Sequence, residues 1–243
     1  GAIVWHFKAP ALPYETPYTY NGSSVYSFTG TPIIADGKLY VDNNEHTPSA
    51  PYTIGWGFWC INMTNGALIW KVDEPMLAGA MADGYTTAND GYSGYMYVFG
   101  KGKSATTVEA PLTAITQGQS VVITGTVTDL SAAQPGTACV SEASMGAYMS
   151  YLHLQSPLPN SVTGVPVSID AIDPNGNYVH IADVTSGISS SFSYMWKPEM
   201  AGKYTVTATF KGSESYGSSF AETAVGVVEA PAATPTPTPA PTA

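Results

Sequence analysis

The residues that most often carry chemistry are sparse in this chain of 243 residues. The segment 91–94, Gly-Tyr-Ser-Gly, is one residue short of the Gly-x-Ser-x-Gly motif of a nucleophile elbow and has a turn-like composition. No His-x-x-x-His or Cys-x-x-Cys spacing of a zinc site occurs. The histidines instead stand far apart, at His6, His46, His153 and His180. The sequence therefore predicts neither an enzyme nor a zinc protein.

Two segments are rich in side-chain oxygen atoms, which calcium accepts as ligands. They are Asp42–His46 and Asp170–Asn177. Neither has the spacing of an EF-hand. An ordinary polar loop explains the first segment, and a hairpin turn explains the second, so we expect no metal ion or other cofactor.

The two cysteines, Cys60 and Cys139, allow two interpretations. They could pair as a disulfide, which would suit a secreted protein, or they could be two independent buried thiols. Two sequons, at Asn21 and Asn62, are candidate glycosylation sites in an exported protein. Asn21 lies in a long polar loop, which favours a glycan there, whereas Asn62 lies at a position that tends to be a structural turn acceptor.

Aromatic residues crowd between Tyr52 and Trp70. Exposed aromatic rings bind sugars or form protein interfaces, because a rigid ring buries much area at a small entropic cost. We consider Trp56, Trp59 and Tyr52 as a possible interface or ligand platform. Packing inside the fold is the alternative, and it is favoured for Trp70.

Composition excludes several kinds of partner. The net charge is −10, arginine is absent, and charged residues make up only 11% of the chain. Nucleic acids and anionic lipids need clustered cations, so neither is expected as a partner. No apolar run approaches the roughly 20 residues of a spanning helix. A composition that is polar but poor in charged residues favours an extracellular or cell-surface protein.

Two echoes reveal an internal repeat. Gly1–Trp5 (Gly-Ala-Ile-Val-Trp) matches Gly66–Trp70 (Gly-Ala-Leu-Ile-Trp), and Ile34–Gly37 matches Met81–Gly84. Repeats indicate solenoids, propellers or arrays. Because Gly1 is already inside a motif, we expect other chain or other copies to complete the first repeat.

The repeat region, residues 1–103, reads as short strands. We expect a hairpin over 33–41 around Asp36-Gly37, a second over 58–72 around Asn65-Gly66, and a strand over 96–99. Two long loops, 9–31 and 43–55, are candidate interaction surfaces.

The rest of the chain, from residue 104 onward, differs in composition from the repeat region. Residues 104–229 carry alternating strands, among them 121–127, 165–172 and 204–210, which favour a β-sandwich. An insertion at 130–160 contains a helix-like stretch over 141–154. Residues 230–243 are a Thr/Pro-rich stalk or linker.

The segment from Cys60 to Trp70 resembles the blade motif of PQQ-like β-propellers, with Asn65 and Gly66 at the turn. The resemblance implies that Trp70, and Trp5 in the partial copy, pack between neighbouring blades. It does not imply a quinone, because the Cys-Cys pair and complete ring of the quinone dehydrogenases are absent. Residues 196–213 resemble bacterial-type immunoglobulin-like domains. The combination is similar to archaeal cell-surface proteins in which propeller repeats precede an Ig-like domain and a stalk.

These observations predict an all-β chain with partial propeller-like blades, then an Ig-like sandwich with one short helix in an insertion. A propeller needs typically 4–8 blades, and this chain holds fewer than two repeats. Open sheet edges then need a partner. We therefore expect a self-assembling surface subunit, of a filament or pilus, whose contacts are the two long loops and Gly1–His6. The alternative is an adhesion module that binds glycans or proteins.

Overall fold

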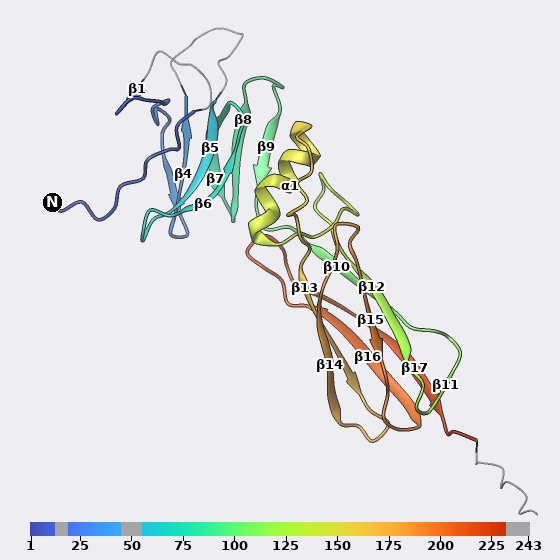
Figure 1. The fold of residues 1–243 in the computed structure, drawn as a ribbon. Coiled ribbons are helices and arrows are strands. Elements are labelled where there is room, and N and C mark those ends of the chain that lie inside the picture. The colour runs from blue at the N-terminus through green and yellow to red at the C-terminus, as the bar shows by residue number, and fades with distance from the viewer. Residues whose placement is uncertain (13–18, 45–54, 232–243) are drawn as a thin grey trace, which may run out of the picture. The chain divides into compact units, whose positions relative to one another are not determined.

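The computed structural model describes residues 1–12, 19–44 and 55–231. Its described part is all-β with a single helix, α1 (Glu142–Leu154), as Figure 1 shows. The chain forms two compact units. The first comprises Gly1–Lys101 and Glu142–Val162, and the second comprises Gly102–Ser141 and Thr163–Ala243. The predicted fold class, blade-like sheets followed by a sandwich with one helix in an insertion, is confirmed.

The first unit contains a four-stranded antiparallel sheet, here called the first sheet, in the order β3-β4-β5-β6. Consecutive strands are neighbours, as in a propeller blade. The turn between β3 and β4 has Asp36 at φ 50° and Gly37 at φ 66°, the left-handed geometry of a two-residue hairpin. The strands are β3 (Ile33–Ala35), β4 (Lys38–Asn43), β5 (Gly57–Asn62) and β6 (Leu68–Val72). A small hairpin, β1 (Thr19–Tyr20) and β2 (Ser23–Ser24), precedes them.

A three-stranded antiparallel sheet, here called the second sheet, follows in the order β7-β8-β9. Its strands are β7 (Met76–Ala82), β8 (Tyr85–Asp90) and β9 (Met96–Phe99). Its first turn has Asp83 at φ 51° and Gly84 at φ 81°, so it repeats the Asp36-Gly37 turn. The sequence echo is therefore structural: β7, β8 and β9 correspond to β3, β4 and β5. The described residues supply no strand that corresponds to β6.

The two sheets of the first unit pack face to face. Phe58, Met76 and Ala88 are buried between them, and partly buried side chains surround these three: Tyr40, Trp70, Val72, Ala78, Tyr97 and Phe99. A second cluster lies on the other face of the first sheet. It consists of Ala9, Val41, Trp59 and Ile61, with Trp5, Phe7, Phe28 and Leu39 packed against it. The first sheet is thus covered on both faces.

Helix α1 belongs to the first unit, although its sequence interrupts the sandwich. Figure 1 shows it beside β9. The His153 ring meets the Tyr97 ring edge-on, with centroids 5.9 Å apart. Burial of His153 lowers its pKa. A methyl group added at Gly146 would lie 3.6 Å from the Lys71 carbonyl oxygen, so α1 also approaches β6 closely.

The second unit is an Ig-like β-sandwich. One sheet has the order β10-β12-β15, and the other has the order β11-β17-β16-β13-β14. Alternate residues are buried along β12 and β16, which places one side of each strand in the core. The strands are β10 (Ser104–Glu109), β11 (Ile115–Thr116), β12 (Val121–Asp129), β13 (Pro166–Ile172), β14 (Tyr178–Thr185), β15 (Ser191–Trp196), β16 (Gly202–Phe210) and β17 (Ser219–Val228).

Tyr204 fixes the entry to β16. Its hydroxyl donates to the Met200 carbonyl oxygen at 3.2 Å and accepts from the Met200 amide at 3.1 Å. Such a bond back to the preceding backbone is the tyrosine corner of Ig-like sandwiches. The Trp196 ring packs perpendicular to the Tyr204 ring at 5.0 Å. The Gly202-x-Tyr204 pattern in the sequence therefore marks a structural corner.

Candidate assembly site

The second sheet has an uncovered apolar face. Met76, Ala88, Tyr97 and Phe99 point toward the first sheet, so the alternating neighbours on these strands point away from it. The outward side chains are largely exposed: Leu77 45%, Tyr85 50%, Met96 63% and Val98 61%. We call Leu77, Tyr85, Met96 and Val98 the open face.

The corresponding face of the first sheet shows what normally covers such a surface. There Tyr40 and Phe58 pack against the second sheet, and Phe58 is fully buried. By the repeat alignment Thr87 takes the place of Tyr40 and Met96 takes the place of Phe58. Within the described chain, the open face therefore lacks the neighbouring sheet that covers its counterpart.

Strand β9 is also an edge strand of its sheet, with helix α1 beside it (Figure 1). It pairs with β8, and among the described strands no other lies beside it. Its counterpart β5 pairs with both β4 and β6. An edge strand presents unpaired N–H and C=O groups that can template pairing with another chain.

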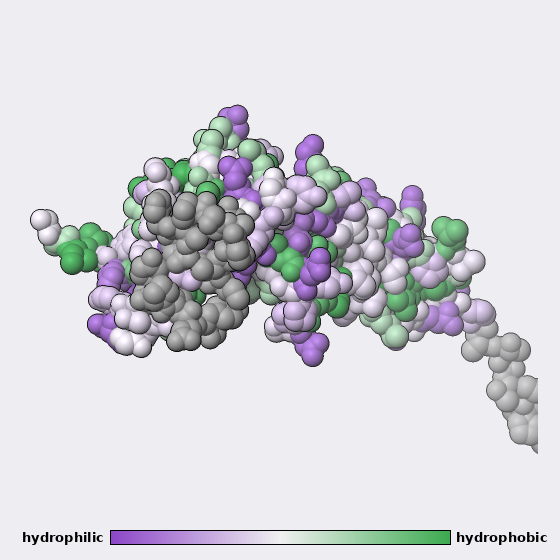
Figure 2. Space-filling model, turned by 90° about the horizontal axis from the view of Figure 1, so that it is seen from above, coloured by the Kyte–Doolittle hydropathy of each residue, from purple (hydrophilic) through white to green (hydrophobic). Residues whose placement is uncertain are grey.

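The N-terminal segment, residues 1–9, lies on the opposite side of the first sheet. Trp5 and Phe7 turn inward and join the cluster around Trp59. The Trp5 Nε1 donates to the Met63 carbonyl oxygen at 2.7 Å. Ile3 and Val4, by contrast, are 86% and 84% exposed. Figure 2 shows hydrophobic residues at the projecting end on the left, where Figure 1 marks the N-terminus.

Trp70, Asn65 and Gly66 lie at the junctions of the repeat. The Trp70 ring sits between the two sheets, 5.5 Å from both Phe58 and Phe99 by ring centroids. The Asn65 Oδ1 accepts the Ala67 amide at 3.0 Å. Gly66 has φ 72°, and a methyl group there would come within 2.8 Å of the Trp5 ring.

The possible aromatic platform is not formed by its two described tryptophans, which are both buried. Trp56 is 7% exposed and Trp59 is 1% exposed. The Trp59 Nε1 donates to the Asn43 Oδ1 at 2.5 Å, and Lys71 Nζ lies 4.5 Å from the centre of the Trp59 ring. Trp59 is therefore a core residue of the first unit. Tyr52 lies outside the described residues.

The possible disulfide between Cys60 and Cys139 is not formed. Both residues are free thiols, and both are buried. Cys60 belongs to the first unit and Cys139 to the second, so each thiol packs into its own core. Burial raises the pKa of Cys60 to about 11 and the pKa of Cys139 to about 12. The interpretation as independent buried thiols describes this structure.

The two sequons differ in their surroundings. Asn21 is exposed at the turn between β1 and β2, with φ 51°. Asn62 ends β5, and its Oδ1 accepts the Thr64 amide at 2.8 Å. The Asn62 side chain is therefore used as a turn acceptor, while Asn21 stands on the surface.

The oxygen-rich segment that begins at Asp42 serves the fold. The Asp42 carboxylate is 2% exposed. It accepts the Asn44 Nδ2 at 2.6 Å and the Ala78 amide at 3.3 Å, which links β4 to β7. Burial raises the Asp42 pKa despite these bonds. Glu45 and His46 lie outside the described residues. In the part of the chain that the structure describes, no cluster of His, Cys, Asp or Glu could hold a metal ion.

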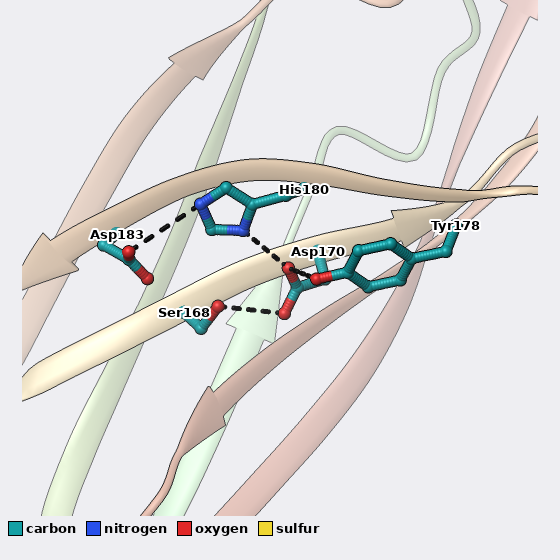
Figure 3. A network of polar contacts seen from close by, with 5 residues as sticks. All are labelled: Ser168, Asp170, Tyr178, His180 and Asp183. Atoms are coloured by element: carbon teal, nitrogen blue, oxygen red, sulfur yellow. Dashed lines mark hydrogen bonds and ion pairs between the residues drawn. The ribbon is translucent and has the colours of Figure 1, made fainter.

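Figure 3 shows a polar network on β13 and β14 of the sandwich. The Asp170 carboxylate accepts the Tyr178 hydroxyl at 2.6 Å and the Ser168 hydroxyl at 3.0 Å, and it bonds the His180 Nδ1 at 2.8 Å. Asp183 lies 3.7 Å from the His180 Nε2. Desolvation raises the Asp170 pKa, but the three hydrogen bonds outweigh it and lower the pKa overall. The arrangement ties two strands together and holds no activated nucleophile.

Comparisons with known proteins add little about function. No family model matches the chain, and no curated protein matches it. Among solved structures, the chain is similar to the CARDB domain of a Pyrococcus furiosus protein, crystallised in complex with di-metal ions. The identity is 14%, the match covers 54% of this chain and 91% of that one, and the TM-score is 0.29. Within the described residues, no helix is long and apolar enough to cross a membrane.

Sequence reasoning missed the open face, although a signal was present. Met96–Phe99 is apolar or aromatic at every position. A continuous apolar run is typical of a strand covered on both faces. The first sheet covers only one face of this strand within the described chain, and the mismatch between pattern and exposure marks the site.

Proposed function

We propose that this protein is an extracellular structural subunit that assembles with copies of itself through its blade-like unit. The observation that carries the proposal is the second sheet. Within the described residues, its open face lacks the covering sheet, and its β9 edge lacks the paired strand, that the first sheet has. Apolar surface contributes about 25 cal/mol for each Å² removed from water, so covering this face favours association. The absence of arginine and the two sequons support an extracellular setting.

Self-association must overcome like charge. The chain carries a net charge of −10, and copies repel one another at low ionic strength. Salt screens this repulsion over about 10 Å at 0.1 M. We therefore expect assembly through apolar contacts and strand pairing to increase with salt.

The glycan-binding alternative has lost its main support. It depended on Trp56 and Trp59 as exposed rings, and both are buried. No described feature favours it over assembly.

Light scattering and negative-stain electron microscopy of the chain at several salt concentrations test the proposal. We expect large particles or filaments, and we expect Val98→Lys on the open face to abolish them. Phe220→Lys is the matched control, because Phe220 is an exposed strand residue of the sandwich, at 68%. A folded monomer at every protein and salt concentration would overturn the proposal.

A further inference from the structure

This inference rests on the proposed self-assembly and specifies its contact. We propose that Ile3–Phe7 of one copy adds to the β9 edge of a second copy as a fourth strand. The added strand would complete the second sheet in the way that β6 completes the first. Each contact would thus build one composite blade from two chains.

The repeat assigns the donor. Ile3–Phe7 occupies the same place after its Gly-Ala pair that Leu68–Val72 occupies after Gly66-Ala67. Leu68–Val72 is β6, the fourth strand of the first sheet. Ile3–Phe7 therefore has the sequence of a fourth strand. In this structure it pairs with none of the described strands.

The repeat also assigns the acceptor and its register. Tyr40 and Thr87 each lie four residues after the Asp of their turn, and they pair with Cys60 and Val98, respectively. Val98 thus takes the place of Cys60. Since Cys60 pairs with Trp70, and Trp5 corresponds to Trp70, we expect Val98 opposite Trp5.

The same alignment extends along the strand. Trp59 pairs with Lys71 in the first sheet. Tyr97 corresponds to Trp59, and His6 corresponds to Lys71, so His6 of the donor should lie opposite Tyr97 of the acceptor. Both assignments depend on the same alignment, so an error in that alignment would change both.

The donor must come from another copy. Trp5 is anchored by its bond to the Met63 carbonyl oxygen and packs against Gly66, on the face of the first sheet that turns away from the second sheet. The first sheet therefore separates Trp5 from β9 of its own chain. The exposed Ile3 and Val4 extend from this anchor and are available to a neighbour.

Charge favours the pairing. The segment 1–12 contains Lys8 and no acidic residue. The segment 73–99, which holds the second sheet, contains four acidic residues and no lysine: Asp73, Glu74, Asp83 and Asp90. A weakly cationic strand therefore meets an anionic sheet, which partly offsets the repulsion between whole chains.

The direction of the array follows from the faces. Trp5 and Phe7 pack on the first sheet of the donor while their backbone would pair with the acceptor. The first sheet of the donor would then pack against the second sheet of the acceptor, in the way that the two sheets pack against each other within one chain. A head-to-tail contact of this kind generates a closed ring or an open filament.

Cross-linking of mixed single-cysteine chains tests the register. His6→Cys and Tyr97→Cys chains are mixed, and a short bis-maleimide is added at neutral pH. We expect a covalent dimer of the two variants. His6→Cys mixed with Leu77→Cys is the control, because Leu77 lies on β7, at the opposite edge of the same sheet. The native thiols are buried, so we expect them not to react with the cross-linker.

A second pair of cysteine variants controls for misfolding of the first pair. Val4 and Val98 are both exposed, so Val4→Cys and Val98→Cys leave the cores intact and should also cross-link. Dimers in both test mixtures but not in the control establish the composite blade. Large assemblies without either cross-link would overturn the donated strand and leave the proposed function standing. A wild-type chain that stays monomeric would overturn both.

Discussion

The indole of Trp70 stacks on the ring of Phe99, with centroids 5.5 Å apart and 21° between the ring planes. Trp70 lies on the last strand of the first sheet, and Phe99 lies on the last strand of the second. Trp5, at the same place in the partial copy, packs against the cluster that contains Ile61 of the first sheet, and Ile61 corresponds to Phe99. In both copies of the motif the tryptophan packs against the sheet that follows it in the chain.

Replacing Trp70 with Ala should therefore weaken the junction between the sheets. We expect a loss of about 3 kcal/mol in the stability of the first unit, near the lower end for Trp→Ala because the ring is only partly buried. Hydrogen exchange of the β5 and β9 amides under mild urea measures it. Tyr95→Ala is the control, since Tyr95 is 70% exposed and should change stability by less than about 0.5 kcal/mol. Equal effects of the two changes would contradict the junction role.

The contact of Trp5 with the Asn65-Gly66 turn can be isolated by a pair of glycine changes. Gly66 and Gly37 both have positive φ, at 72° and 66°, but only Gly66 has a neighbour, the Trp5 ring. Both Ala variants should lose about 1 kcal/mol to backbone strain. Gly66→Ala should lose more, because the methyl group displaces Trp5. Thermal unfolding measures both, and the excess should vanish in a Trp5→Ala background.

The sequence predicted the elements better than the surroundings of single side chains. Two-residue turns such as Asp36-Gly37 and the strand over 96–99 are local signals, and they lie where they were predicted. Burial of Trp59 is not local. It depends on Phe7 and Phe28, whose rings lie 5.7 and 5.8 Å away and come from distant segments. For the same reason, the sequence could not show that α1 would belong to the first unit.

The Asp170 network should give the sandwich a pH dependence. The folded-state pKa of Asp170 is lowered, so its contribution to stability is present above the ordinary pKa, near 3.9, and is lost as the pH falls through the lowered value. Asp170→Asn should cost about 1 kcal/mol at pH 7. The difference from wild type should shrink below about pH 4.

Urea unfolding at a series of pH values measures this difference. Asp183→Asn is the matched control, because the Asp183 side chain is 74% exposed and lies 3.7 Å from His180. An exposed pair contributes at most about 1 kcal/mol, and often nothing measurable. A constant gap between Asp170→Asn and wild type from pH 7 to low pH would contradict the role of the carboxylate.

Both thiols should be unreactive in the folded protein. Burial raises the pKa of Cys60 to about 11 and that of Cys139 to about 12, so the reactive thiolate is scarce at pH 8. A thiol reagent such as dithionitrobenzoate should label neither residue until urea unfolds the chain. Leu112→Cys supplies the control, since Leu112 is fully exposed. A reductant should leave the melting temperature unchanged. A fall in melting temperature would instead indicate that the two cysteines form a disulfide.

Glycosylation should distinguish the two sequons. Asn21 is exposed on a hairpin turn, whereas the Asn62 side chain accepts the Thr64 amide. We expect mass spectrometry of protein from its source to find a glycan on Asn21 and none on Asn62. Asn21→Gln should then remove the glycan mass with little change in stability. Asn62→Gln should leave the mass of the glycan unchanged and lower stability by about 1 kcal/mol, because the longer side chain misplaces the turn acceptor. A glycan on Asn62 would mean that its turn opens before modification, and hydrogen exchange at the Thr64 amide would then be fast.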